Sequence, residues 1–167
     1  MEVQRKAILK LYEGKSEHQL NYRTSPDSWS MLDELHHLVL VDHQIVAQCT
    51  HPLLVKKMAQ KKARVPYFVV LLVLRSGIRV PVPNNDERLM PKPGQSLTGL
   101  IEERHSAQEK IKTQLASVSH EDLTSPFMVH PVCGGINPAN FITFLMAHDT
   151  YHFRNLKRLH KKLLSQK

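Results

Sequence analysis

Two histidines in the last quarter of the chain have a spacing that suits the chelation of a metal ion. His148 and His152 stand four residues apart in the stretch NPANFITFLMAHDTYHFRNLKRLHKKLL. In an α-helix, positions four apart differ by about 40° around the axis, so both imidazoles lie on one face. A histidine pair at i and i+4 can bind a single transition-metal ion.

The helix face that carries these histidines is otherwise apolar, which places both imidazoles inside the protein. Each could simply be hydrogen-bonded within a core, but two in register on one apolar stripe favour a metal site. A third ligand must then come from another helix. The stripe also holds Asn155, and it contrasts with a basic opposite side. The apolar positions are Phe141, Leu145, Leu156, Leu159 and Leu163, and the basic ones are Arg154, Lys157, Arg158 and Lys161.

Candidates for the third ligand lie in the stretch WSMLDELHHLVLVDH. Its apolar side chains cluster around Asp42, which makes Asp42 a buried carboxylate, and His36 lies nearer to this face than His37. His37 instead continues a second stripe that begins at Trp29. Helical periodicity alone does not choose between the two neighbouring histidines.

The segments SWSMLDELHHL and HDTYHFRN together resemble the DinB-like and YfiT-like four-helix metalloproteins. In that family a Trp-Ser pair precedes a His-Leu pair by eight residues. A C-terminal motif has two histidines separated by three residues, then usually a glutamine three positions later. Counting from Trp29 selects His37, and the second motif selects His148 and His152. The resemblance implies that these three histidines bind a divalent metal ion.

The chain departs from the family pattern at two positions. Asn155 stands where glutamine is usual and Asp33 where glutamate is frequent, so both side chains have a shorter reach. Asp42 occupies a commonly acidic position. Zinc or nickel suits three imidazole ligands, and a metal with open positions permits metal-assisted hydrolysis. The resemblance implies, as the other reaction, transfer involving a low-molecular-weight thiol cosubstrate. Candidate catalytic residues are Asp42, Arg104 and Asn155, and the small-molecule substrate is unassigned.

Other polar residues are candidates for the site or for its surroundings. Arg104 and Gln108 fall on the apolar stripe of LTGLIEERHSAQEKI, where an inward arginine needs a carboxylate such as Asp42 or an anionic substrate. We expect Arg104 instead to reach the surface. Asp149 either orients an imidazole or faces solvent. His105, His120, His130 and His160 are expected on the surface or in loops, and His43 and His51 are weaker candidates for the cavity.

Helical periodicity and capping residues predict the elements that position these side chains. Helical patterns cover residues 1–20, a stretch from near Ser28 to before Pro52 capped by Ser25 or Asp27, and 96–118. A final helix begins at Asn137 and Pro138 and ends near Leu164. Segment 65–75 is either a buried helix or a strand by its apolar pattern alone, and the neighbouring helices favour a shorter helix. Segments 80–96 and 124–135 are predicted to be loops, and no sheet is expected. This pattern indicates an all-α, up-and-down four-helix bundle with an additional short helix, in a single domain 1–167.

Composition favours a cytoplasmic protein without a membrane segment. The 167 residues are 41% hydrophobic, and the longest apolar run, VPYFVVLLVL, is about half as long as a membrane-spanning helix. The N-terminal stretch lacks the apolar region of a signal peptide. Cys49 and Cys133 are not in a metal-finger spacing, and Cys49 is expected to be a small buried residue. The apolar segment 65–75 suggests two alternatives: a homodimer through this segment, or its burial within one chain.

The net charge of +8 raises the alternative of an anionic partner. The basic residues are spread over two stretches, KKMAQKKAR and RNLKRLHKKLL, and no nucleic-acid recognition motif is present, so nucleic acid is not expected. A second class of function remains open: a non-catalytic protein whose histidines hold a metal that braces the bundle, or whose basic surface binds an anionic partner.

Overall fold

The computed structural model describes residues 2–49, 52–59 and 63–165, which form seven α-helices and one two-stranded sheet. The longest helices are α3, α6 and α7, with shorter helices at the N-terminus and between α3 and α6. In chain order the elements are α1 (Glu2–Lys10), α2 (Glu17–Leu20), α3 (Met31–Cys49), α4 (Pro52–Ala59), α5 (Tyr67–Ser76), the 3-10 turns η1 (Pro83–Asn85) and η2 (Glu87–Leu89), α6 (Leu97–Ala116), β1 (Met128–His130), β2 (Gly134–Ile136) and α7 (Pro138–Leu164).

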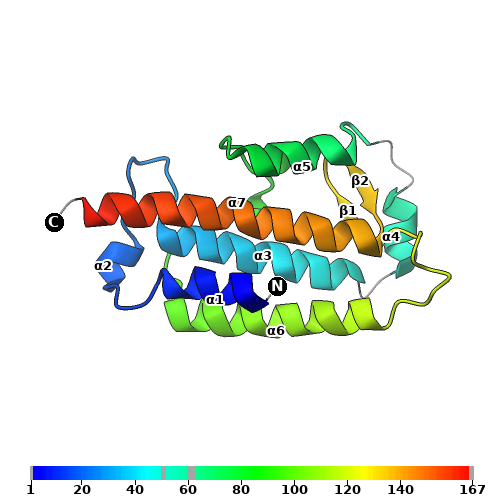
Figure 1. The fold of residues 1–167 in the computed structure, drawn as a ribbon, viewed down its shortest axis with the longest axis horizontal. Coiled ribbons are helices and arrows are strands. Elements are labelled where there is room, and N and C mark those ends of the chain that lie inside the picture. The colour runs from blue at the N-terminus through cyan, green and yellow to red at the C-terminus, as the bar shows by residue number, and fades with distance from the viewer. Residues whose placement is uncertain (1, 50–51, 60–62, 166–167) are drawn as a thin grey trace.

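Helices α1, α3, α6 and α7 run alongside one another, and α5 covers α7 on the side away from α6 (Figure 1). Helix α3 is central, because it packs against both α6 and α7. The predicted helical bundle is therefore confirmed. Its connections carry more structure than the single additional short helix expected, since α2, α4 and the hairpin accompany α5.

Side-chain caps explain where the long helices begin. Asn137 caps α7 by accepting a hydrogen bond from the Asn140 backbone N–H, as the sequence predicts. Helix α3 is capped by Ser30, whose hydroxyl accepts from the Asp33 N–H at 3.1 Å while the Asp33 carboxylate accepts from the Ser30 N–H at 2.8 Å. The predicted cap at Ser25 or Asp27 was wrong, because the residues before Ser30 form a separate turn.

Segment 124–135, predicted to be a loop, contains most of a β-hairpin. Strands β1 and β2 pair antiparallel with Val129 opposite Gly135. Gln48 of α3 holds the hairpin, since its side-chain carbonyl accepts from the Val129 N–H at 2.7 Å. Three-residue strands are too short to produce a recognisable alternation, so the sequence pattern did not reveal them.

The apolar core consists of two clusters at different levels of the bundle. One contains Ile8, Leu35, Leu100 and Leu156 and joins all four helices of the bundle. The other contains Ile45, Ile111, Phe141 and Leu145 together with residues of the hairpin. On α3, His37 lies between Leu35 and Val39 of the first cluster. On α7, His148 and His152 directly follow Ala147 and Tyr151 of the second cluster.

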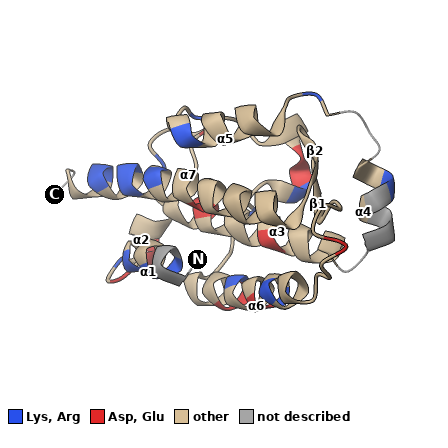
Figure 2. Cartoon of the chain, turned by 45° about the vertical axis from the view of Figure 1, so that its right-hand side comes forward, with Lys and Arg blue, Asp and Glu red and all other residues tan. Residues whose placement is uncertain are grey.

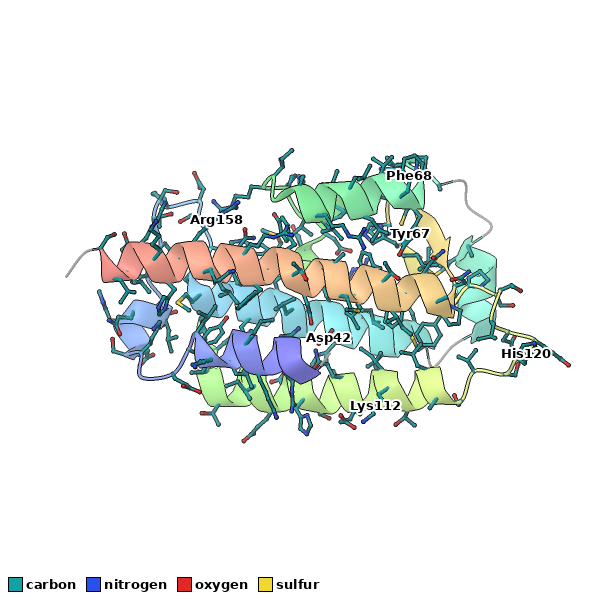
Figure 3. All side chains as sticks on the ribbon, in the orientation of Figure 1. Asp42, Tyr67, Phe68, Lys112, His120 and Arg158 are labelled. Atoms are coloured by element: carbon teal, nitrogen blue, oxygen red, sulfur yellow. The ribbon has the colours of Figure 1, made fainter. Side chains whose placement is uncertain are left out.

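Helix α5 confirms the helix predicted over 65–75, and its two sides differ. The Tyr67 hydroxyl donates to the Asn140 carbonyl oxygen of α7, whereas Phe68 points away from the bundle (Figure 3). Phe68 and Leu72 are 61% and 60% exposed. A homodimer through this face stays a prediction.

The basic residues of α7 lie on its exposed side toward the C-terminal end, as Figure 2 shows. Lys157, Arg158 and Lys161 are all exposed there. Among the described residues, no helix has both the length and the apolar character needed to cross a membrane.

Candidate metal centre

The structure brings together the three histidines that the family resemblance selects. His37 comes from α3, and His148 and His152 come from α7; one ring nitrogen of each lies within 4.8 Å of the other two. The side chains are buried, with residue exposures of 5%, 9% and 3%. His36 belongs elsewhere, because its Nδ1 accepts a hydrogen bond from the Lys92 N–H at 3.1 Å. The structure thus places His37, and not His36, beside His148 and His152, a choice that helical periodicity alone did not make.

Two of the three imidazoles are oriented by hydrogen bonds at their outer nitrogens. His37 Nδ1 donates to the Leu89 carbonyl oxygen at 2.8 Å, and His152 Nδ1 donates to Glu34 Oε2 at 2.5 Å. Because a carbonyl or a carboxylate can only accept, Nδ1 carries the hydrogen in each ring. Each Nε2 therefore keeps its lone pair, which is the arrangement in which histidines bind metal ions.

The cluster has the charge state and the spacing that a divalent cation requires. Burial lowers the pKa of His37, and burial with neighbouring charges lowers the pKa of His148 and His152 well below the ordinary value. The rings are therefore neutral ligands. The Nε2 atoms of His148 and His152 are 3.2 Å apart, which suits two nitrogens bound at about 2.0–2.1 Å to one ion. The residues present fit a bound divalent metal.

Glu34 is a functional candidate that sequence analysis missed. Its side chain is 1% exposed, and it contacts the imidazole of His152. Burial raises the pKa of Glu34 to about 7, and the neighbouring His37, Arg79 and a hydrogen bond from Asn155 partly oppose this rise. The available signal was its place one helical turn before His37, which puts both side chains on neighbouring parts of one face.

A cavity of about 740 Å³ lies beside the histidines, which form part of its wall. Residues of α3, α5 and α7, of the hairpin and of the segment 79–90 line it, and it is open to solvent on one side. Its size falls within the range of small-molecule sites, about 300–1,000 Å³. Apolar wall residues from several elements include Val65, Val69, Val73, Val82, Leu89 and Met128. The candidate metal centre thus faces a largely apolar chamber.

A family model for the DinB superfamily matches residues 1–156. The chain belongs to the DinB superfamily. The matched region includes all three histidines, Glu34 and Asn155, so the cluster lies within the part that defines the family. No curated protein matches the chain significantly.

In this DinB protein, His130 lies at the cavity rather than simply on the surface or in a loop, which corrects the sequence prediction. Its Nδ1 accepts from the Val132 and Cys133 backbone N–H groups at 3.2 and 3.4 Å, so Nε2 carries the hydrogen. Burial lowers the pKa of His130 to about 4. The ring is therefore a neutral hydrogen-bond donor beside Phe144, at 5.1 Å between ring centroids.

The expectation that Arg104 reaches the surface was wrong. Arg104 is 3% exposed; its Nη2 donates to Asp149 Oδ1 at 2.6 Å and its Nε to Asp42 Oδ2 at 3.4 Å. Asp149 is buried in this network. Neither Asp42 nor Arg104 is among the residues that line the cavity, whereas Asn155 lines it.

The remaining candidates lie away from the centre. Asp33 is used by the Ser30 cap and by an ion pair with Arg23 at 2.8 Å. Cys49 and Cys133 are buried, and burial raises the pKa of their thiols to about 12 and about 11, which makes both poor nucleophiles. His43, His105 and His120 are exposed, His160 is half-buried, and His51 lies outside the described residues.

Proposed function

We propose that this DinB protein is a metal-dependent enzyme that acts on a small, largely apolar molecule. The observation that supports it most directly is the position of three neutral histidines in the wall of an apolar cavity. A purely structural metal site would be enclosed by four protein ligands. Here three histidines face a chamber of about 740 Å³, which leaves access for a ligand.

The protein's own residues would hold and orient the ion. His37, His148 and His152 supply three nitrogen ligands, while Leu89 and Glu34 fix the rings of His37 and His152. A divalent metal such as zinc or nickel, when bound, would lower the pKa of a water molecule or a thiol at an open coordination position. The apolar wall would exclude bulk water from this position.

Of the two reactions, we favour transfer of a low-molecular-weight thiol, because few carboxylates of the cavity lining are free to act as a general base. Of the described residues that line the cavity, only Asp27 and Glu34 carry a carboxylate, and Glu34 is engaged by His152. Hydrolysis commonly requires a free general base, whereas a thiolate is already the nucleophile. The sulfur of the thiolate would bond to an electrophilic carbon of the substrate. The leaving group would depart from that carbon with the bonding electrons, and the proton lost by the thiol would pass to solvent.

Hydrolysis is the second candidate because of His130. Its Nδ1 is occupied by two backbone donors, so the N–H at Nε2 is available in a residue that lines the cavity. Such a donor could stabilise negative charge that develops on a carbonyl oxygen.

Metal analysis with a matched pair of variants tests the proposal. Elemental mass spectrometry of the purified protein should find about one equivalent of zinc or nickel, lost in His37→Ala but kept in the neighbouring His36→Ala. Each sample is then assayed for conjugation of glutathione or cysteine to 1-chloro-2,4-dinitrobenzene and for hydrolysis of 4-nitrophenyl acetate. Metal-dependent turnover in the first assay supports thiol transfer, and in the second supports hydrolysis. Failure to bind divalent ions even after they are added back would refute the metalloenzyme and leave the non-catalytic alternative.

A further inference from the structure

We propose that the cavity selects an apolar ligand with an anionic group, and that Arg79 binds this group. The inference rests on the proposed function, because it names the class of molecule that would enter the same site. It concerns a residue to which neither the motifs nor the metal cluster assign a role.

Arg79 is the residue of the cavity lining that can pair with an anion. Among the described residues that line the cavity, Asp27 and Glu34 carry a carboxylate, and Arg79 is the only arginine or lysine. Glu34 is turned to His152 and is 1% exposed. Asp27 and Arg79 are both exposed. Arg79 is therefore the described side-chain cation that a ligand in the cavity can reach from solvent.

Arg79 lines the same cavity as the three histidines. The N–H of the next residue, Val80, donates to the Tyr151 hydroxyl, and the Tyr151 ring lies 5.0 Å from the His152 ring between centroids. A ligand anchored by Arg79 would thus share the cavity with the candidate metal centre.

The backbone around Arg79 is fixed on both sides. On one side, Gly77 ends α5 in the left-handed conformation with φ of 76°, and its carbonyl oxygen accepts from Arg158 Nη2 at 3.2 Å. On the other side, the Val80 N–H donates to the Tyr151 hydroxyl at 3.0 Å, and Val82 is buried. The segment that carries Arg79 is therefore anchored to α7, which reduces the entropy lost when the guanidinium pairs with an anion.

The apolar residues of the cavity wall favour an apolar body for the ligand whose anionic group pairs with Arg79. The valines of α5 and of the adjoining segments, with Leu89 and Met128, present apolar surface over most of the cavity. An apolar body would be desolvated there, and desolvation strengthens the pairing of its charged end with a guanidinium. The complementary molecule is an alkyl or aryl carboxylate, or a related sulfonate or phosphate.

Three eight-carbon probes that differ only in the head group test the proposal: octanoate, octan-1-ol and octylammonium. Their binding is measured by isothermal titration calorimetry on the purified protein, on Arg79→Gln and on Arg75→Gln. Arg75 is the matched control, because it is exposed on α5 and does not line the cavity. The metal content of each sample is measured in parallel.

We expect octanoate to bind at least about tenfold more tightly than the alcohol and the ammonium compound. Arg79→Gln should remove this preference, and Arg75→Gln should keep it. Equal octanoate affinity in Arg79→Gln and the unmodified protein would overturn the proposal, as would tighter binding of octylammonium or no binding of any probe. If the preference depends on Arg79 in protein that cannot bind metal, the proposed function fails while this inference survives.

Discussion

At the scale of single residues, Glu34 orients one of the three histidines of the candidate metal centre. Its carboxylate accepts the Nδ1 hydrogen of His152 at 2.5 Å in a buried setting. Such an outer partner fixes the orientation of the ring and increases the basicity of the nitrogen that faces the metal. Glu34 therefore belongs to the site although it does not meet the ion itself.

We predict that Glu34→Gln weakens zinc binding about 10- to 100-fold, because an amide is a poorer acceptor than a carboxylate. Competition with a chromophoric chelator measures the dissociation constant. Glu103→Gln is the control, since Glu103 is an exposed carboxylate on α6 and should leave zinc affinity unchanged. Equal affinity in Glu34→Gln and the parent protein would show that Glu34 does not support the ligand.

Candidate site residues in spaced motifs could be selected from the sequence. Residues whose contacts depend on tertiary packing could not. The i, i+4 pair His148 and His152 followed from helix geometry, and counting from Trp29 chose His37 where periodicity could not. Neither Glu34 nor His130 is one of the motif positions that the family resemblance selects. Arg104 was assigned to the surface because only the folded chain shows two carboxyl groups beside it.

At the scale of elements, a buried charged network joins α3, α6 and α7. Arg104 of α6 contacts Asp42 of α3 and Asp149 of α7. Burial raises the pKa of Asp42 from 3.8 to about 7, against the lowering effect of Arg104. The folded protein therefore keeps a proton on Asp42 over a pH range in which the unfolded chain has released it.

This difference predicts how stability depends on pH. Because the folded-state pKa is the higher one, the contribution of Asp42 to stability falls as pH rises from about 4 to about 7. Asp42→Asn removes the titration, so its stability relative to the parent protein should rise by on the order of 2 kcal/mol between pH 5 and pH 8. Urea unfolding at several pH values measures the difference, in which metal release contributes equally to both proteins. A difference that is flat with pH, as expected for the exposed control Glu109→Gln, would contradict the assignment.

Helices whose own sequence carries a cap or an apolar stripe were predicted correctly. Strands that depend on contacts with residues far away in the chain were not predicted. Helix α7 carries its own cap and a long apolar stripe, so it was predicted from local signals. The apolar run of α5 fits a helix or a strand by itself, and the neighbouring helices favoured a helix. The strands β1 and β2 have three residues each and depend on Gln48 of α3 for support. No local pattern encodes such a long-range contact.

At the scale of the whole molecule, the arrangement of the core separates the role of the metal from that of the fold. The two apolar clusters contain none of the three histidines and connect the bundle helices without them. The buried Arg104 network is a further link between α3, α6 and α7 that does not require an ion. We therefore expect the bundle to stay folded without metal.

We predict that chelation leaves the far-ultraviolet circular dichroism at 20 °C unchanged but lowers the melting temperature. An ion present at about 100 times its dissociation constant contributes about 2.7 kcal/mol. For a chain of this size that corresponds to a decrease of about 5–10 °C. His37→Ala should melt at the lower temperature with or without added zinc, and His36→Ala should respond to zinc like the parent protein. Loss of the helical signal on chelation at 20 °C would instead mean that the ion braces the bundle, because a catalytic site on a self-sufficient core does not need its metal to fold.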